Sequence, residues 1–196
     1  MLPAPYPLNV EVPSHATVAR WRPLLNWLLV IPHYIWLGIL QVGLEILVII
    51  SWFVILFTGR LPENWGSFIV GVLRYQWRVV CFLYAWTEVY PGFSPPTGYP
   101  DPGGYPAILQ MVPDQRRNRL TVLFRAFMVI PQFIVLYFVG IAASVVLLIC
   151  WFVVLFTGRW PDGMRDFCIG YYRWYTRTEA YYFLVTDVYP PFRLGP

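Results

Sequence analysis

The 196-residue chain contains no lysine and little charge of either sign. Its 14 basic residues are all arginine, and charged residues make up 12% of the chain, whereas soluble domains typically carry about a quarter. Hydrophobic residues make up 58% of the chain and the mean hydropathy is +0.55. This composition favours an integral membrane protein, in which arginine excess marks the cytoplasmic side. The chain also lacks a basic run with interleaved aromatics, so nucleic acid is not an expected partner.

Residues that typically carry catalysis or hold metal are also scarce. The three cysteines, Cys81, Cys150 and Cys168, lie in apolar surroundings without CxxC spacing, so a disulfide framework is not expected. The two histidines, His15 and His33, have no second ligand at metal spacing. Gly-rich phosphate loops, nucleophile elbows and His-Glu-x-x-His motifs are absent as well. The sequence therefore predicts no catalytic residue, no metal site and no cofactor, and a protein that is not an enzyme.

One stretch occurs twice and organises the chain. Residues 52–63 read WFVILFTGRLPE, and residues 151–162 read WFVVLFTGRWPD. Glycine readily takes the left-handed conformation just past a helix end, and proline is tolerated where the next helix begins. The stretch therefore predicts a junction between two helices in each copy, formed by Gly59 and Pro62 and by Gly158 and Pro161.

The repeat extends over most of the chain. A shift of 99 positions aligns the chain with itself without a gap, and about a third of the aligned positions are identical. The predicted organisation is an N-terminal tail 1–19 with a candidate strand, membrane repeat 20–93, Pro/Gly linker 94–104, repeat 105–192 and C-terminal tail 193–196. In the second repeat, 105–112 is a candidate strand and 119–192 the membrane part. The two candidate strands could pair with each other.

Each repeat contains an apolar run, at 24–57 and 123–156, that admits two interpretations. As a hairpin, each limb has about 16 residues and the tip of the first copy falls near residues 41–45. As a long span, Pro32 and Pro131 break off a lead helix, and Glu45 then lies near the bilayer centre at a cost of several kcal/mol unless it is paired. The hairpin is favoured because it leaves every arginine on one side of the membrane.

An aromatic segment follows each run, at 64–88 and 163–187. Arg74 and Arg78 lie on one helical face with Gly71, and Arg173 and Arg177 occupy the equivalent positions. An arginine stripe on an aromatic helix is typical of an amphipathic helix in the membrane interface. The predicted fold class is therefore an all-α integral membrane protein of two tandem repeats.

Three motifs support a family resemblance that covers both repeats. They are Trp-Phe-x-x-Leu-Phe-Thr-Gly-Arg-x-Pro, Phe-x-x-Gly-x-x-Arg-x-x-x-Arg and Thr-Asp/Glu-x-Tyr-Pro-x-Phe, with one departure at Gly92, where the second repeat has Pro191. With them the chain resembles a bacterial family of uncharacterised multi-pass membrane proteins, known only as a domain of unknown function. The resemblance implies membrane class and architecture, and no activity.

The arginines found in both repeats are the candidate binding residues. The planar fork of arginine can bind a phosphate or carboxylate through two hydrogen bonds, so lipids, including anionic ones, other membrane proteins and self-association are the expected partners. The candidates for lipid or partner binding are Arg60, Arg74, Arg78, Arg159, Arg173 and Arg177. The expected function is that of a scaffold, accessory subunit or membrane-shaping element in the inner membrane, multi-pass, with most arginines on the cytoplasmic side. The alternative is an oligomeric anion-conducting pore or transporter subunit.

Overall fold

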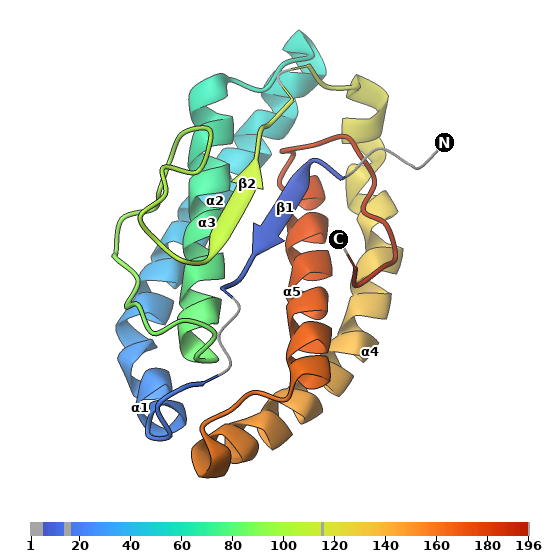
Figure 1. The fold of residues 1–196 in the computed structure, drawn as a ribbon. Coiled ribbons are helices and arrows are strands. Elements are labelled where there is room, and N and C mark those ends of the chain that lie inside the picture. Colours follow the sequence, from blue (N-terminus) through green and yellow to red (C-terminus); the bar gives the residue numbers. More distant parts are fainter. Residues whose placement is uncertain (1–5, 14–16, 115, 196) are drawn as a thin grey trace.

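The computed structural model describes residues 6–13, 17–114 and 116–195, which form five helices and two short strands. Figure 1 shows them as a pair of long outer helices, a pair of shorter helices and a two-stranded ribbon. The elements are β1 (Leu8–Glu11), α1 (Arg22–Leu29), α2 (Ile31–Thr58), α3 (Glu63–Leu83), β2 (Ile108–Met111), α4 (Arg119–Thr157) and α5 (Asp162–Tyr182).

The apolar runs form long helices, so the favoured hairpin prediction is wrong. In the first repeat the run is α1 followed by α2, with the boundary at Val30 just before Pro32. In the second repeat α4 continues through Pro131 for 39 residues, so that proline breaks off no lead helix. Residues 41–45 lie within α2, and Glu45 is half-buried rather than at an exposed tip. A tip there was plausible from Gly43 and Glu45, but the helix continues through both residues.

The junction glycines have the conformation that the sequence predicts. Gly59 ends α2 at a φ of 70°, and Gly158 ends α4 at a φ of 69°. Each donates its backbone N–H to a carbonyl one turn earlier, at 2.7 Å and 2.8 Å. Pro62 and Pro161 lie immediately before α3 and α5. In each repeat the chain therefore reverses direction without a long loop.

The two strands pair antiparallel and reveal how the repeats are related. Val10 lies opposite Leu109, which is its own equivalent 99 positions later. The reciprocal contacts continue at both ends of the molecule: Val18 N donates to Gly158 O at 2.8 Å, and Arg117 N donates to Gly59 O at 2.9 Å. A pseudo-twofold axis therefore passes through the ribbon, and α2 and α4 run antiparallel.

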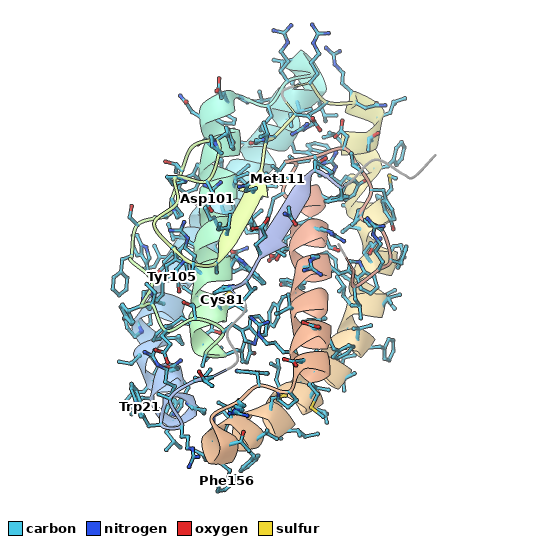
Figure 2. The ribbon with its side chains drawn as sticks, in the orientation of Figure 1. Trp21, Cys81, Asp101, Tyr105, Met111 and Phe156 are labelled. Carbon is cyan, nitrogen blue, oxygen red and sulfur yellow. The ribbon has the colours of Figure 1, made fainter. Side chains whose placement is uncertain are left out.

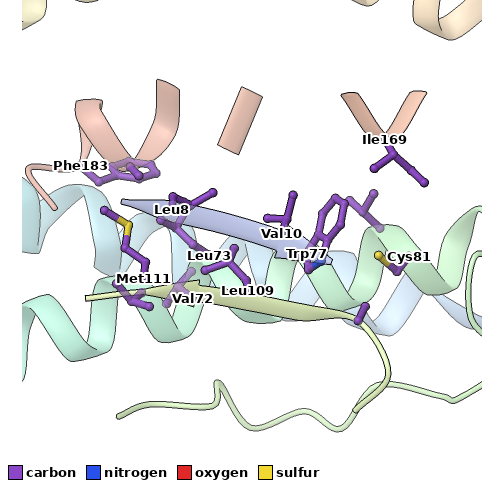
Figure 3. Close-up of a cluster of buried hydrophobic side chains, with 14 of the residues drawn as sticks. Leu8, Val10, Val72, Leu73, Trp77, Cys81, Leu109, Met111, Ile169 and Phe183 are labelled. Atoms are coloured by element: carbon purple, nitrogen blue, oxygen red, sulfur yellow. The ribbon is translucent and has the colours of Figure 1, made fainter. Parts of the chain in front are cut away.

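The elements form three layers in the order α2/α4, α3/α5 and ribbon. The ribbon contacts α3 and α5 but neither α2 nor α4. Figure 3 shows β1 toward α5 and β2 toward α3, with Leu8, Val10 and Leu109 among the buried side chains. Because α3 is covered on nearly all sides, it does not lie in the interface as an amphipathic helix, and that prediction is wrong for α3. Helix α5 is buried over Thr176–Tyr181 and exposed near its start.

The outer layer leaves a large apolar surface uncovered. Helices Arg22–Thr58 and Arg119–Thr157 are long and apolar enough to cross a membrane, and only 22% of the most apolar window of each is buried. Side chains that are at least half-exposed recur along both helices, including Ile35, Val42, Ile46, Phe57, Phe127, Tyr137, Phe138, Ile141 and Phe156. We call this surface the apolar face.

Candidate functional site

The Thr-Asp/Glu-x-Tyr-Pro motif fastens the end of each shorter helix to the start of the long helix of its own repeat. Asp187 accepts the backbone N–H of Asn118 at 2.7 Å, and Glu88 accepts that of Ala19 at 3.5 Å. Tyr90 and Tyr189 donate their hydroxyls to carbonyls of the long-helix segments, at 3.3 Å and 3.2 Å. The contacts of this motif therefore stabilise the fold of each repeat.

In the first repeat the arginine stripe binds a carboxylate of the chain itself. Arg74 Nε lies 3.0 Å from Asp101 Oδ2, and Arg78 Nη2 donates to Asp101 Oδ1 at 2.9 Å. The side chain of Arg74 is 0% exposed and that of Asp101 is 1% exposed. Burial lowers the pKa of Arg74, and the charge of Asp101 opposes that shift. We call Arg74, Arg78 and Asp101 the closed clamp.

The closed clamp also covers the outer edge of the ribbon. Arg74 Nε donates to Leu109 O at 3.0 Å, and Leu109 N donates to Asp101 Oδ2 at 3.3 Å. An uncovered strand edge exposes unpaired backbone groups, so the clamp satisfies both groups of Leu109 at once. Figure 2 labels Asp101 and Tyr105 in the segment between α3 and β2, beside α3.

Glycine beside the arginines allows the linker to approach α3. A Cβ built on Gly71 would lie 3.0 Å from Thr97 Cγ2 and 3.4 Å from Pro96 O. Arg74 Nη1 donates to that same Pro96 carbonyl. Gly71 therefore admits the backbone of the linker, residues 94–104, beside the arginine stripe.

In the second repeat the same two arginines have no carboxylate among the described residues. Arg173 Nη1 donates to Leu194 O at 3.0 Å, and Arg177 Nη1 donates to Gly195 O at 2.9 Å. The Nε atoms of both arginines are buried without a hydrogen-bond partner in the described chain. Burial, followed by the charges of Arg173 and Arg193, lowers the pKa of Arg177 to about 10. We call Arg173 and Arg177 the open clamp.

Two tyrosines that precede the strands support both clamps. Tyr105 donates to the carbonyls of Arg78 and Val89, at 3.2 Å and 2.8 Å, and Tyr6 makes the equivalent bonds to Arg177 and Val188, at 3.3 Å and 3.2 Å. The guanidinium carbons of Arg78 and Arg177 lie 5.1 Å and 5.5 Å from the ring centres of these tyrosines. The repeated Tyr-Pro dipeptide is the sequence signal for this pairing, which the sequence analysis did not assign a role.

The remaining predicted arginines lie at opposite ends of the long axis. Arg60 and Arg159 are both exposed, next to the ends of α2 and α4. Arg60 forms an isolated backbone bridge with Arg116, whereas Arg159 follows the end of α4, where Figure 2 labels Phe156. The structure therefore does not bring the six candidate arginines together: it separates two exposed arginines from two pairs, each with one buried and one half-buried member.

Sequence reasoning missed three residues that neutralise or carry buried charge. Asp101 lies in the predicted Pro/Gly linker 94–104, and its carboxylate was assigned no role. Arg125 is 2% exposed and donates to Tyr181 O at 2.8 Å and to Asp187 Oδ1. Arg117, 6% exposed, donates to Leu184 O at 3.0 Å. Among the described residues no three His, Cys, Asp or Glu side chains come together as a metal site.

Comparison with known families places the repeats in one family. A family model described as a domain of unknown function, DUF4389, matches residues 20–94 and again 119–193. These matches cover more than half of the chain, so the chain belongs to this family, as the motifs indicated. No curated protein and no solved structure matches the chain.

Proposed function

We propose that this member of the family is a non-enzymatic membrane protein that lies in one leaflet and acts there as a scaffold or membrane-shaping element. The observation that carries the proposal is the apolar face of α1, α2 and α4 on the opposite side of the molecule from the polar ribbon. The arrangement replaces the predicted multi-pass insertion with helices that lie in the membrane plane.

The length of the long helices supports an in-plane arrangement. At 1.5 Å per residue, the 39 residues of α4 extend about 58 Å. Crossing a hydrocarbon core of about 30 Å would need a tilt of about 60°, whereas spanning helices tilt by about 0–40°. In the plane of the membrane, the same helix fits without mismatch.

The ribbon gives a second reason to propose an in-plane arrangement. It lies along the middle of α3, where Arg74 meets Leu109, and its outward side chains Asn9, Glu11 and Gln110 are exposed. In a spanning orientation these polar side chains would face hydrocarbon, where polar groups without a hydrogen-bond partner are costly. With the apolar face in the membrane, they face water.

The in-plane arrangement also explains why α2 and α4 are hydrophobic on all sides. One side of each helix packs on the protein core, through residues such as Leu44 and Val154, and the other side enters lipid. A body that fills one leaflet more than the other favours curvature. The exposed Arg60 and Arg159 then lie at headgroup level, at both ends of the molecule, where they can contact lipid phosphates.

The test is thiol labelling at the two ends. The three native cysteines are buried, so an impermeant maleimide will report on introduced thiols, with unmodified protein as the blank. In sealed vesicles we expect Arg60→Cys and Arg159→Cys to react from the same side. The matched mid-length pair is Gln110→Cys on the ribbon, expected to react, and Ile141→Cys on the apolar face, expected to be protected. Labelling of positions 60 and 159 from opposite sides would overturn the proposal.

The pore hypothesis receives no comparable support. Its prediction places Arg74 and Arg78 along an aqueous path for anions, but both bind Asp101 and the linker. We therefore retain the scaffold hypothesis.

A further inference from the structure

We propose that the open clamp is a docking site for the carboxylate of an acidic residue in an extended polypeptide segment. The closed clamp shows what such a pair of arginines binds in this fold, because the two pairs occupy equivalent positions and are held by equivalent tyrosines. The inference concerns the partner of the proposed scaffold and does not depend on how the protein lies in the membrane.

One unpartnered atom distinguishes the open clamp from the closed clamp. Arg74 Nε holds both Asp101 and Leu109 O, whereas Arg173 Nε, its equivalent, is buried with no partner in the described chain. Arg177 is 2% exposed, so its charge is desolvated without an ion pair among the described residues. Leaving a buried charged donor unpaired is costly, and a carboxylate at this position would remove that cost.

The other charges around the open clamp do not fill it. Arg193 adds a positive charge next to Arg177. The charge of Asp166 partly opposes the lowering of the Arg173 pKa by burial. Asp166 is nevertheless exposed and forms no ion pair with that guanidinium. The local field therefore attracts an anion.

The closed clamp explains why we assign a polypeptide rather than a free anion as the ligand. Leu109 has both backbone groups bound by the closed clamp, whereas Val10, its equivalent on the outer edge of β1, has no such side-chain partner in the described residues. Val10 is nevertheless only 1% exposed, so the chain itself covers this edge, and the polypeptide is inferred from the closed clamp, where one extended segment supplies both a backbone carbonyl and a carboxylate. In the closed clamp that segment is Pro/Gly-rich and carries Asp101.

The chain already covers part of the site with its own backbone. A Cβ built on Gly170 would lie 2.9 Å from both Leu194 Cβ and Leu194 O, so residues 193–195 pack on α5 as residues 94–98 pack on α3. Leu194 and Gly195 thus supply backbone carbonyls to the open clamp, but no described residue supplies a carboxylate to it. The ligand is therefore a short acidic segment that enters beside Leu194.

The experiment uses a labelled peptide with the sequence of residues 97–104, Thr-Gly-Tyr-Pro-Asp-Pro-Gly-Gly, and the full chain in detergent. We expect saturable binding, with affinity lowered by about tenfold or more in Arg173→Gln and with the peptide that carries Asn for Asp, since a hydrogen-bonded charge is lost. Arg159→Gln, at an exposed arginine of the junction, is the control and should bind like wild type.

A second variant keeps the test informative should Arg173→Gln fail to fold. Appending Gly-Tyr-Pro-Asp-Pro-Gly-Gly after Pro196 places an aspartate at the position equivalent to Asp101, and the same extension with Asn is its match. The Asp extension should block the peptide and the Asn extension should not. Absence of peptide binding, or binding that ignores Arg173 and the aspartate, would overturn the proposal. Binding of inorganic phosphate through Arg173 without peptide binding would overturn the polypeptide ligand in favour of a free anion. None of these failures would affect the labelling result at positions 60 and 159.

Discussion

In the first repeat the two arginines of the shorter helix share one buried carboxylate, whereas in the second the equivalent arginines hold only backbone carbonyls in the described chain. In the second repeat an ion pair lies elsewhere, between the buried Arg125 and the partly exposed Asp187. At the equivalent of Arg125, the first repeat has Asn26, which donates to Phe82 O at 2.6 Å. The backbone geometry is therefore repeated, but the placement of buried charge is not, and this difference is what the variants below address.

The largest expected effect is the loss of the acid from the closed clamp. Asp101→Asn leaves the buried charge of Arg74 without a counter-ion, which typically costs about 3–5 kcal/mol of unfolding free energy. The matched change in the second repeat is Asp166→Asn, at an exposed acid near the open clamp, and should stay within about 0.5 kcal/mol. Thermal unfolding of both variants in the same detergent measures the contrast. Equal stabilities would show that Asp101 does not stabilise the closed clamp.

The next effect is a pH dependence that only the second repeat can supply. Glu179 accepts both bonds of Gln76 Nε2, at 3.2 Å and 3.0 Å, and its equivalent in the first repeat is Val80. Burial raises the pKa of Glu179 to about 7, so the folded protein binds this proton more tightly than the unfolded chain does. Stability should therefore fall as the pH rises from about 4.5 to 7, by on the order of 1–3 kcal/mol, since each unit of pKa difference is worth about 1.4 kcal/mol. Glu179→Gln should flatten the melting temperature over this pH range, and an unchanged slope in that variant would assign the dependence to other groups.

Local chemistry explains what the sequence predicted correctly. The strands and the two glycine caps are determined by residues close together in the sequence, and the repeat by the alignment of the chain with itself. All of them appear in the structure. The hairpin was wrong because Gly43 and Glu45 were interpreted as a tip, although Glu45 lies beside Trp52, Arg125 and Tyr182 along one groove. The role of Asp101 could not be predicted, because an ion pair between a linker and a helix depends on the packing of that linker on Gly71.

The smallest expected effect compares the two junction glycines. Both lie at positive φ, so replacement by alanine should cost about 1–2 kcal/mol at either position. Their surroundings differ: a Cβ on Gly59 would meet Arg119 Nε at 3.3 Å, near the end of an exposed and flexible side chain, whereas a Cβ on Gly158 would meet Val18 O at 3.0 Å. Val18 is held in place by its own hydrogen bond to Gly158 O, so the backbone cannot withdraw without losing that bond. Gly158→Ala should therefore be less stable than Gly59→Ala by about 1 kcal/mol, measured as a difference in unfolding free energy under one set of conditions. The reverse order would mean that the contact between Val18 and Gly158 yields more easily than the side chain of Arg119.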